Sequence, residues 1–179
     1  LSLRGVLQQA TNIPAEAVAT TDIVSHPKDY FIANIPTLLI SFARSGNSPE
    51  SVAAVNLADE ICQNCFHLII TCNQQGHLAQ YQPKHEKFCI VLPKESDDKS
   101  LVMTSSYTFM LLTGLRVAKY KTLEATQKSV ETVIRYAKQF LFMHRDELRD
   151  IANLNFNRAV FLGAGSFYGT TTEANLKLQ

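Results

Sequence analysis

Short apolar runs alternate with segments of helical periodicity along the first 122 residues of the chain. Four of these runs are rich in β-branched and aromatic residues and are predicted to be buried strands: AVATT (17–21), TLLISF (37–42), FHLIITC (66–72) and FCIVL (88–92). Between the second and the third run, Val52, Val55, Ala58 and Ile61 recur at helical spacing. This alternation predicts an α/β fold, a three-layer α/β/α sandwich with a parallel sheet.

The remaining segments are predicted to be helical, with one exception. The run from residue 100 to 120 is apolar almost all round, so we expect a helix buried under the sheet, whereas the run 123–152 is amphipathic and is typical of a connector. RAVFLGAGSFYGTTTEANLKLQ, residues 158–179, repeats a strand, a glycine-rich turn and a helix. The pattern therefore divides the chain into a first domain (1–122), a helical connector (123–157) and the beginning of a second domain (158–179).

The N-terminal segment LSLRGVLQQATNI has the pattern of a crossover helix without the strand that should precede it. A lone strand and helix at 158–179 cannot bury both faces of a new sheet. We therefore expect that the first domain lacks its first strand and loop, and that material is missing at both ends.

Composition and charge exclude some partners. Lys and Arg total 17 against 16 Asp and Glu, a net charge of +1, which gives no global electrostatic reason to expect nucleic acid or an anionic membrane surface. No apolar run approaches the roughly 18 residues of a spanning helix, and the N-terminus has no signal-peptide pattern. The default expectation is a cytoplasmic protein.

The four cysteines are candidates for metal or redox chemistry. Cys62 and Cys65 form a CxxC, but no second CxxC or HxxxH completes a tetrahedral set, although His67, His77 and His85 are available on paper. We favour reduced, largely buried thiols, with Cys72 and Cys89 in the same state, and expect no metal.

The stretch ISFARSGNSPES, residues 40–51, leads from a predicted strand through a polar loop into a helix that we expect to begin at Pro49. Open α/β sheets bind ligands at the carboxyl ends of their strands, and a helix N-terminus offers free N–H groups and partial positive charge. The loop adds the hydroxyls of Ser45 and Ser48, a close backbone approach at Gly46 and the charge of Arg44. A phosphate suits this arrangement. The residues alone leave open that Ser48 is only an N-cap and that Ser45, Gly46 and Asn47 only form a turn.

The loop closely resembles the phosphate loop of sugar isomerase domains, in which a strand is followed by serine, variable residues, Ser-Gly, a polar residue, and Ser or Thr. The longer match resembles the tagatose-6-phosphate ketose/aldose isomerase or galactosamine-6-phosphate deaminase/isomerase branch of that family; it consists of TTDIVSHPKDYF, LLISFARSGNSPESVAAVNLADE, ITCN and MTSSYT. The resemblance covers nearly the whole chain.

The resemblance implies roles for individual residues. Ser45 and Ser48 would bind the sugar phosphate with Arg44, Gly46 and Asn47 beside them. Ser105, between Thr104 and Ser106, would lie near the sugar or its phosphate, although hydroxyls at such positions also serve as helix caps. We favour the functional interpretation for Ser105 only.

Glu173 and Lys177 would be members of the catalytic set. By spacing alone they form an ordinary i,i+4 ion pair. In relatives a second acid follows three residues later, which here would be position 180, and a histidine lies further on. We therefore expect the 179 residues to bind weakly or to be inactive while the parent enzyme is active.

Gly163, Gly165 and Gly169 suggest a dinucleotide fingerprint, but their spacing is GxGxxxG rather than GxGxxG. Too few residues follow for a second strand and its ribose-binding acid, so close packing of strand on helix explains these glycines better.

The resemblance implies isomerisation with deamination of galactosamine 6-phosphate to tagatose 6-phosphate, without metal or organic cofactor, in a homo-oligomer. Two alternatives stay open: a ketose/aldose isomerase without deamination, and a regulator that binds a sugar phosphate and does no chemistry.

Overall fold

The computed structural model describes residues 1–100 and 102–178; Leu101 and Gln179, which fall within predicted segments, lie outside the described residues. The chain divides into two compact units. The first, Glu16–Thr113, is called the sheet unit below. The second, Leu1–Ala15 with Gly114–Gln179, is called the helical unit, and each is described by itself.

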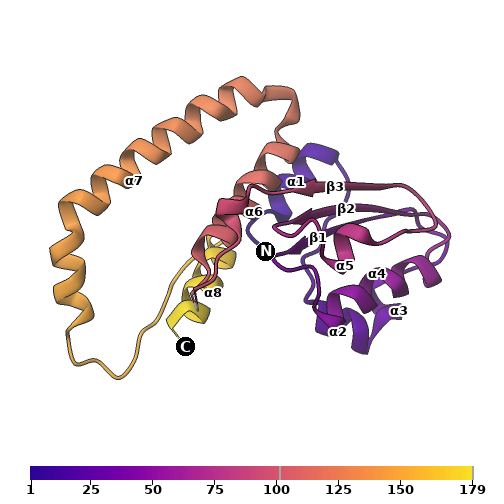
Figure 1. Ribbon diagram of the computed structural model, residues 1–179, viewed down its shortest axis with the longest axis horizontal. Coiled ribbons are helices and arrows are strands. Elements are labelled where there is room, and N and C mark those ends of the chain that lie inside the picture. The colour runs from indigo at the N-terminus through magenta and orange to yellow at the C-terminus, as the bar shows by residue number, and fades with distance from the viewer. Residues whose placement is uncertain (101, 179) are drawn as a thin grey trace. The chain divides into compact units, whose positions relative to one another are not determined.

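The sheet unit contains three parallel strands in the order β1-β2-β3: β1 (Thr37–Ala43), β2 (Cys65–Thr71) and β3 (Lys87–Val91) (Figure 1). Parallel strands need crossover connections, and α4 (Pro49–Ile61) and the short α5 (His77–Gln80) supply them. The three strands that were predicted at 37–42, 66–72 and 88–92 are confirmed to within one residue at each end. The central strand β2 is the most deeply buried of the three, because it has a neighbour on both edges.

The two faces of the sheet are covered by different helices. Ile69 of β2 packs with Val55 of α4 and Leu78 of α5, each no more than 1% exposed. On the other face, Ile70 and Leu92 pack against Phe109 and Met110, which belong to α6 (Thr104–Ala118). The three-layer prediction is therefore confirmed. The helix expected under the sheet is present, but most of its side chains are only half-buried.

The prediction of a strand at 17–21 is wrong. Residues 16–19 are irregular and the chain then enters α2 (Thr20–Ser25), followed by α3 (Pro27–Tyr30). The β-branched residues suggested a strand, but the helical turn carries an acid, Asp22, in its first turn and places Ile23 in a core cluster with Phe31, Ala54 and Ala58. Burial of Ile23 overrides the local β-propensity.

The helical unit consists of α1 (Arg4–Thr11), the end of α6, the 3₁₀ turn η2 (Tyr120–Thr122), α7 (Leu123–Ala152) and α8 (Ser166–Leu178). The predicted helices at the N-terminus, at 123–152 and after the glycine-rich turn are confirmed. The sheet unit contains one further short element, the 3₁₀ turn η1 (Lys94–Ser96), which follows β3. The predicted strand in RAVFL, residues 158–162, does not form; these residues are irregular and exposed. A strand needs a partner for its backbone hydrogen bonds, and this segment pairs with no strand in the described part of the chain.

Within residues 1–100 and 102–178, no helix combines the length and the apolar character that a membrane span requires.

Candidate functional site

The loop between β1 and α4, residues 44–48, lies at the carboxyl end of β1, as the sequence predicts. Gly46 is buried and has a φ of +67°, in the left-handed region that favours glycine. A Cβ at this position would contact Leu78 and Thr71 at 3.5 Å, so the positive φ, more than space, calls for glycine here. The chain reverses at Gly46 and then enters α4.

Ser48 is the N-cap of α4, with extended backbone (φ −63°, ψ 132°) and Pro49 at the first helical position. Its Oγ accepts a hydrogen bond from the Ser51 N–H at 3.4 Å and donates to the Ser51 Oγ at 2.6 Å. The predicted helix start is therefore confirmed. Ser51 was not identified from the sequence, although its position three residues after an N-cap serine is a signal for it.

Ser45 lies half-buried at the start of the turn, and its Oγ accepts a hydrogen bond from the Asn47 N–H at 3.3 Å. The first N–H groups of α4 are those of Glu50 and Ser51, since Pro49 has none, and the Ser51 N–H donates to the Ser48 Oγ. The helix dipole adds partial positive charge at this end of α4. Hydroxyls, free amides and the helix end therefore lie within five residues. Such a loop can bind a phosphate or another tetrahedral anion.

Arg44 is more constrained than its sequence position suggests. Its guanidinium donates to the Asp98 carbonyl oxygen at 2.6 Å and lies 3.8 Å from the Asp97 carboxylate. The side chain thus ties the loop to the segment after β3. Because a guanidinium has five N–H donors, this contact leaves others for a ligand.

Ser105 lies in the first turn of α6, next to Ser106. The Asp98 carboxylate accepts hydrogen bonds from the Ser106 N–H at 2.9 Å and the Ser106 Oγ at 3.4 Å. The pKa of Asp98 is lowered, chiefly by the backbone hydrogen bond from Ser106 and also by hydrogen bonds from Ser105. Asp98 therefore links Arg44 to the turn that carries Ser105. It was not identified from the sequence, although the acids in KESDDKS precede a helix start.

Glu173 and Lys177 lie one turn apart on α8, in the helical unit. The Lys177 Nζ and the Glu173 Oε1 are 2.6 Å apart, and both side chains are one-quarter exposed. The spacing argument predicts this ion pair, and the structure contains it. The catalytic roles of the two residues remain a prediction.

The glycines at 163, 165 and 169 are explained by turns and close packing within the helical unit. Gly165 has a φ of +57°. A Cβ on Gly163 would lie 2.9 Å from the Phe167 carbonyl oxygen, and a Cβ on Gly169 would lie 2.4 Å from the Ser2 Oγ. Close packing therefore explains the glycines at 163 and 169. The contacts are with the first turn of α8 and with the N-terminal segment, not with a strand.

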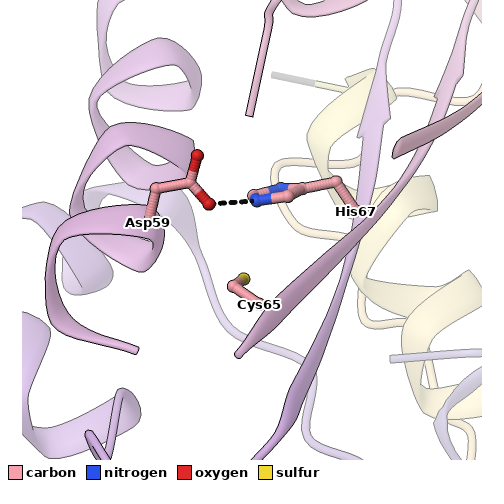
Figure 2. Close-up of side chains that lie close together, drawn as sticks. All are labelled: Asp59, Cys65 and His67. Carbon is pink, nitrogen blue, oxygen red and sulfur yellow. Dashed lines mark hydrogen bonds and ion pairs between the residues drawn. The ribbon is translucent and has the colours of Figure 1, made fainter. Parts of the chain in front are cut away.

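Asp59, Cys65 and His67 form a buried polar group between α4 and β2, in which the His67 ring points toward the Asp59 carboxylate and Cys65 lies beside them (Figure 2). The His67 Nε2 lies 2.8 Å from the Asp59 Oδ1, while the Asp59 Oδ2 accepts hydrogen bonds from the Tyr81 hydroxyl at 2.6 Å and the Lys84 N–H at 3.1 Å. Burial disfavours ionisation of Asp59, but hydrogen bonds from Tyr81, His67 and Lys84 outweigh it and lower its pKa. We therefore assign the Nε2 proton to His67 as a donor to an ionised carboxylate.

This group has the spacing of a candidate metal site, because its three donor atoms lie within 4.8 Å of one another. A closed zinc site takes four ligands, and this group supplies three. Both Asp59 oxygens already accept hydrogen bonds, and burial, with contributions from Cys62 and Asp59, raises the pKa of Cys65 to about 12. The donor set fits a hydrogen-bonded core better than a metal. The four cysteines are all free thiols, and all except the half-buried Cys89 are buried.

No family model matches the chain, but curated proteins and solved structures are similar to it over most of its length. D-galactosamine-6-phosphate deaminase AgaS of Shewanella sp. (strain ANA-3) is 44% identical over 163 residues, which are 90% of this chain and 41% of that protein. The crystal structure of tagatose-6-phosphate ketose/aldose isomerase from Escherichia coli has a TM-score of 0.86 at 36% identity, over 97% of this chain and 47% of the other. A solved structure from Clostridium novyi NT has a TM-score of 0.93 at 43% identity, over 98% of this chain and 45% of the other.

The parallel α/β unit and these similarities define the class as a sugar isomerase domain protein. Within that class the chain belongs to the AgaS-like family, on the strength of sequence and fold together. The chain spans less than half the length of each of these three relatives.

Proposed function

We propose that the full-length protein converts galactosamine 6-phosphate and water to tagatose 6-phosphate and ammonia. The names of the relatives support this proposal: one group is named for deamination of galactosamine 6-phosphate, and the solved structure from Escherichia coli for isomerisation of tagatose 6-phosphate. The two reactions share an enolisation between C1 and C2 of a phosphorylated sugar.

The observation that carries the proposal is the loop at residues 44–48. It combines a left-handed glycine, two serine hydroxyls and the N-terminus of a 13-residue helix at the carboxyl end of a parallel strand. This arrangement favours a dianionic phosphate over a neutral sugar, because the donors and the helix dipole act on negative charge. Ser45 and Ser48 are the proposed phosphate ligands, with Arg44, Gly46, Asn47 and Ser105 beside them.

The proposed chemistry is acid–base catalysis. A base removes the proton from C2 of the open-chain amino aldose while an acid protonates the carbonyl oxygen O1, which gives an enamine. A proton then adds to C1 and the nitrogen loses one, which leaves a hydroxyl on C1 and an imine at C2. Water adds to this imine, the C–N bond breaks, and the nitrogen leaves as ammonia. No electrons pass to or from the sugar overall, so the step calls for no redox cofactor. Glu173 and Lys177 are proposed members of the catalytic set.

Two alternative functions would also use a phosphate-binding loop at residues 44–48. An isomerase without deamination would act on tagatose 6-phosphate, as the name of the solved Escherichia coli relative says of that protein. A regulator would bind the sugar phosphate and do no chemistry.

The compartment, oligomeric state, partners and domain organisation of the protein are also proposals. We propose a cytoplasmic homo-oligomer with no nucleic acid or membrane partner, in which residues 1–122, 123–157 and 158–179 are a first domain, a connector and the beginning of a second domain. Four free thiols suit a reducing compartment, and the net charge of +1 provides no general attraction for polyanions.

A phosphorus NMR time course of the full-length protein with galactosamine 6-phosphate, combined with an ammonium assay, tests the function. The proposal predicts a new ketose-phosphate resonance and an equal amount of ammonium. An unchanged spectrum without ammonium would overturn it, and a second run on tagatose 6-phosphate then separates the isomerase from the regulator.

A further inference from the structure

Residues 71–78, which we call the clamp segment, form hydrogen bonds with residues 44–47 of the loop. The clamp segment runs from the end of β2 into α5. Four consecutive loop residues each present one acceptor to it. The donor and acceptor pairs are Thr71 Oγ1 to Arg44 O (3.3 Å), Asn73 Nδ2 to Ser45 O (3.0 Å), Leu78 N to Gly46 O (3.0 Å) and His77 N to Asn47 Oδ1 (2.9 Å).

These contacts decide which way the loop amides face. The carbonyl of one residue and the N–H of the next lie in one peptide plane and point in opposite directions. Because the carbonyls of Arg44, Ser45 and Gly46 face the clamp segment, the N–H groups of Ser45, Gly46 and Asn47 face away from it. The Asn47 N–H donates to the Ser45 Oγ. The N–H groups of Ser45 and Gly46 have no acceptor among residues 1–100 and 102–178.

Two residues of the clamp segment are suited to this task. The orientation of the Asn73 side-chain amide is set by a hydrogen bond that its Oδ1 accepts from the Gln75 N–H at 3.0 Å. The Nδ2 therefore faces the Ser45 carbonyl. Gly76 is buried, and a Cβ there would lie 2.3 Å from the same Ser45 oxygen. Its φ of −69° is open to any residue, so closeness to the loop is what requires glycine.

We infer that the clamp segment positions the amides of Ser45 and Gly46 for a phosphate, with Asn73 and Gly76 as the positioning residues. This rests on the proposed function, and it goes beyond it by assigning a role to residues that contact the loop from behind. Neither residue touches the phosphate. Each acts through the Ser45 carbonyl.

The test uses the full-length protein and three variants. Asn73→Ala removes one donor to the loop, and Gly76→Ala pushes the Ser45 carbonyl away. Gly5→Ala is the matched control for the second change, because a Cβ at Gly5 would meet nothing within 4 Å. Calorimetry with galactosamine 6-phosphate and with inorganic phosphate measures affinity. Hydrogen exchange of the Leu78 amide, which donates to the Gly46 carbonyl, reports the clamp without any ligand.

We expect Asn73→Ala to raise both dissociation constants about fivefold, the order expected for one neutral hydrogen bond, and Gly76→Ala to raise them at least about tenfold. Exchange of the Leu78 amide should quicken in the same order, while Gly5→Ala changes neither quantity. A core variant away from the clamp segment, Ile23→Val in the cluster with Phe31 and Ala58, controls for general destabilisation: it should lower the thermal midpoint and leave affinity unchanged.

The outcomes separate the two proposals. Unchanged exchange and unchanged affinity in Asn73→Ala and Gly76→Ala would overturn the inference while leaving the function standing. A loss of affinity in Ile23→Val equal to that in Asn73→Ala would also overturn it, because destabilisation alone would then explain the effect. If the unaltered protein binds neither ligand, the proposed function fails, and Leu78 exchange still decides whether the clamp segment holds the loop.

Discussion

The sheet unit and the helical unit differ in where their side chains find partners. In the sheet unit, Val55, Ile69 and Leu78 are at most 1% exposed, whereas α1, α7 and α8 contain no buried residue and Phe142 of α7 is 89% exposed. Helices still form in both units, because a helix satisfies its own backbone hydrogen bonds. The apolar run at 158–162 forms no strand, because a strand depends on a neighbour.

The largest effect that we predict contrasts the two units directly. Ile69→Ala in the sheet core should lower the free energy of unfolding by about 3 kcal/mol, because it opens a cavity in a fully buried layer. Ile134→Ala, the matched change on α7, should alter it by less than about 0.5 kcal/mol in the 179-residue chain, because Ile134 is 47% exposed. Urea denaturation of both variants measures the difference.

The same two variants, Ile69→Ala and Ile134→Ala, can also be compared in the full-length protein. A cost at Ile134 that approaches the cost at Ile69 would show that the apolar stripe of α7 is covered there. A small cost at Ile69 in the 179-residue chain would contradict the description of the sheet core.

We expect a smaller loss of stability from a change in the buried polar group formed by Asp59, Cys65 and His67. Asp59→Asn should cost about 2 kcal/mol at pH 7, because it leaves a buried donor of His67, Tyr81 or Lys84 without a charged acceptor. The pKa of Asp59 is lower in the folded protein than its ordinary value of 3.8, so its stabilising contribution is complete above that value and is lost as the pH falls through the folded pKa.

Denaturation curves at pH 7 and at pH values below 4 check this prediction. The gap between the unaltered protein and Asp59→Asn should narrow toward acid. A gap that stays constant with pH would mean that the carboxylate charge is not what stabilises this group.

The smallest change in stability is expected at the ion pair of the helical unit. Glu173→Gln should cost about 0.2–0.5 kcal/mol, the value of an i,i+4 pair on a helix surface. If Glu173 takes part in proton transfer, the same variant should reduce the turnover of the full-length enzyme by about a hundredfold or more. A rate assay beside a melting curve separates the two roles, and turnover within about twofold of the unaltered enzyme would restrict Glu173 to the ion pair.

Much of the sheet unit could be predicted because its signals are local. The apolar runs gave three strands to within a residue, and Ser48, Pro49 and Glu50 gave the start of α4. The failures at 17–21 and 158–162 have different causes. At 17–21 the burial of Ile23 in a core cluster overrides the local β-propensity, whereas 158–162 pairs with no strand in the described part of the chain.

The candidate site was predicted only in part for a related reason. The residues of the loop could be read from ARSGNSPES, since they are contiguous. The residues that hold the loop could not, because Asn73 contacts Ser45 across 28 positions and Asp98 contacts Arg44 across 54. The acids in KESDDKS precede a helix start, but the sequence near Asn73 and Asp98 does not identify Ser45 and Arg44 as their partners.

The central claim is that the loop at residues 44–48 binds the phosphate of a sugar. Calorimetric titration of galactosamine 6-phosphate into the full-length protein and into Ser45→Ala and Ser48→Ala tests it most directly. We predict that each variant binds at least about tenfold more weakly, as expected for loss of a hydrogen bond to a charged group, while the fold is retained and Ser48→Ala loses about 1 kcal/mol of stability as an N-cap. Unchanged affinity in both variants would contradict the assignment of the loop.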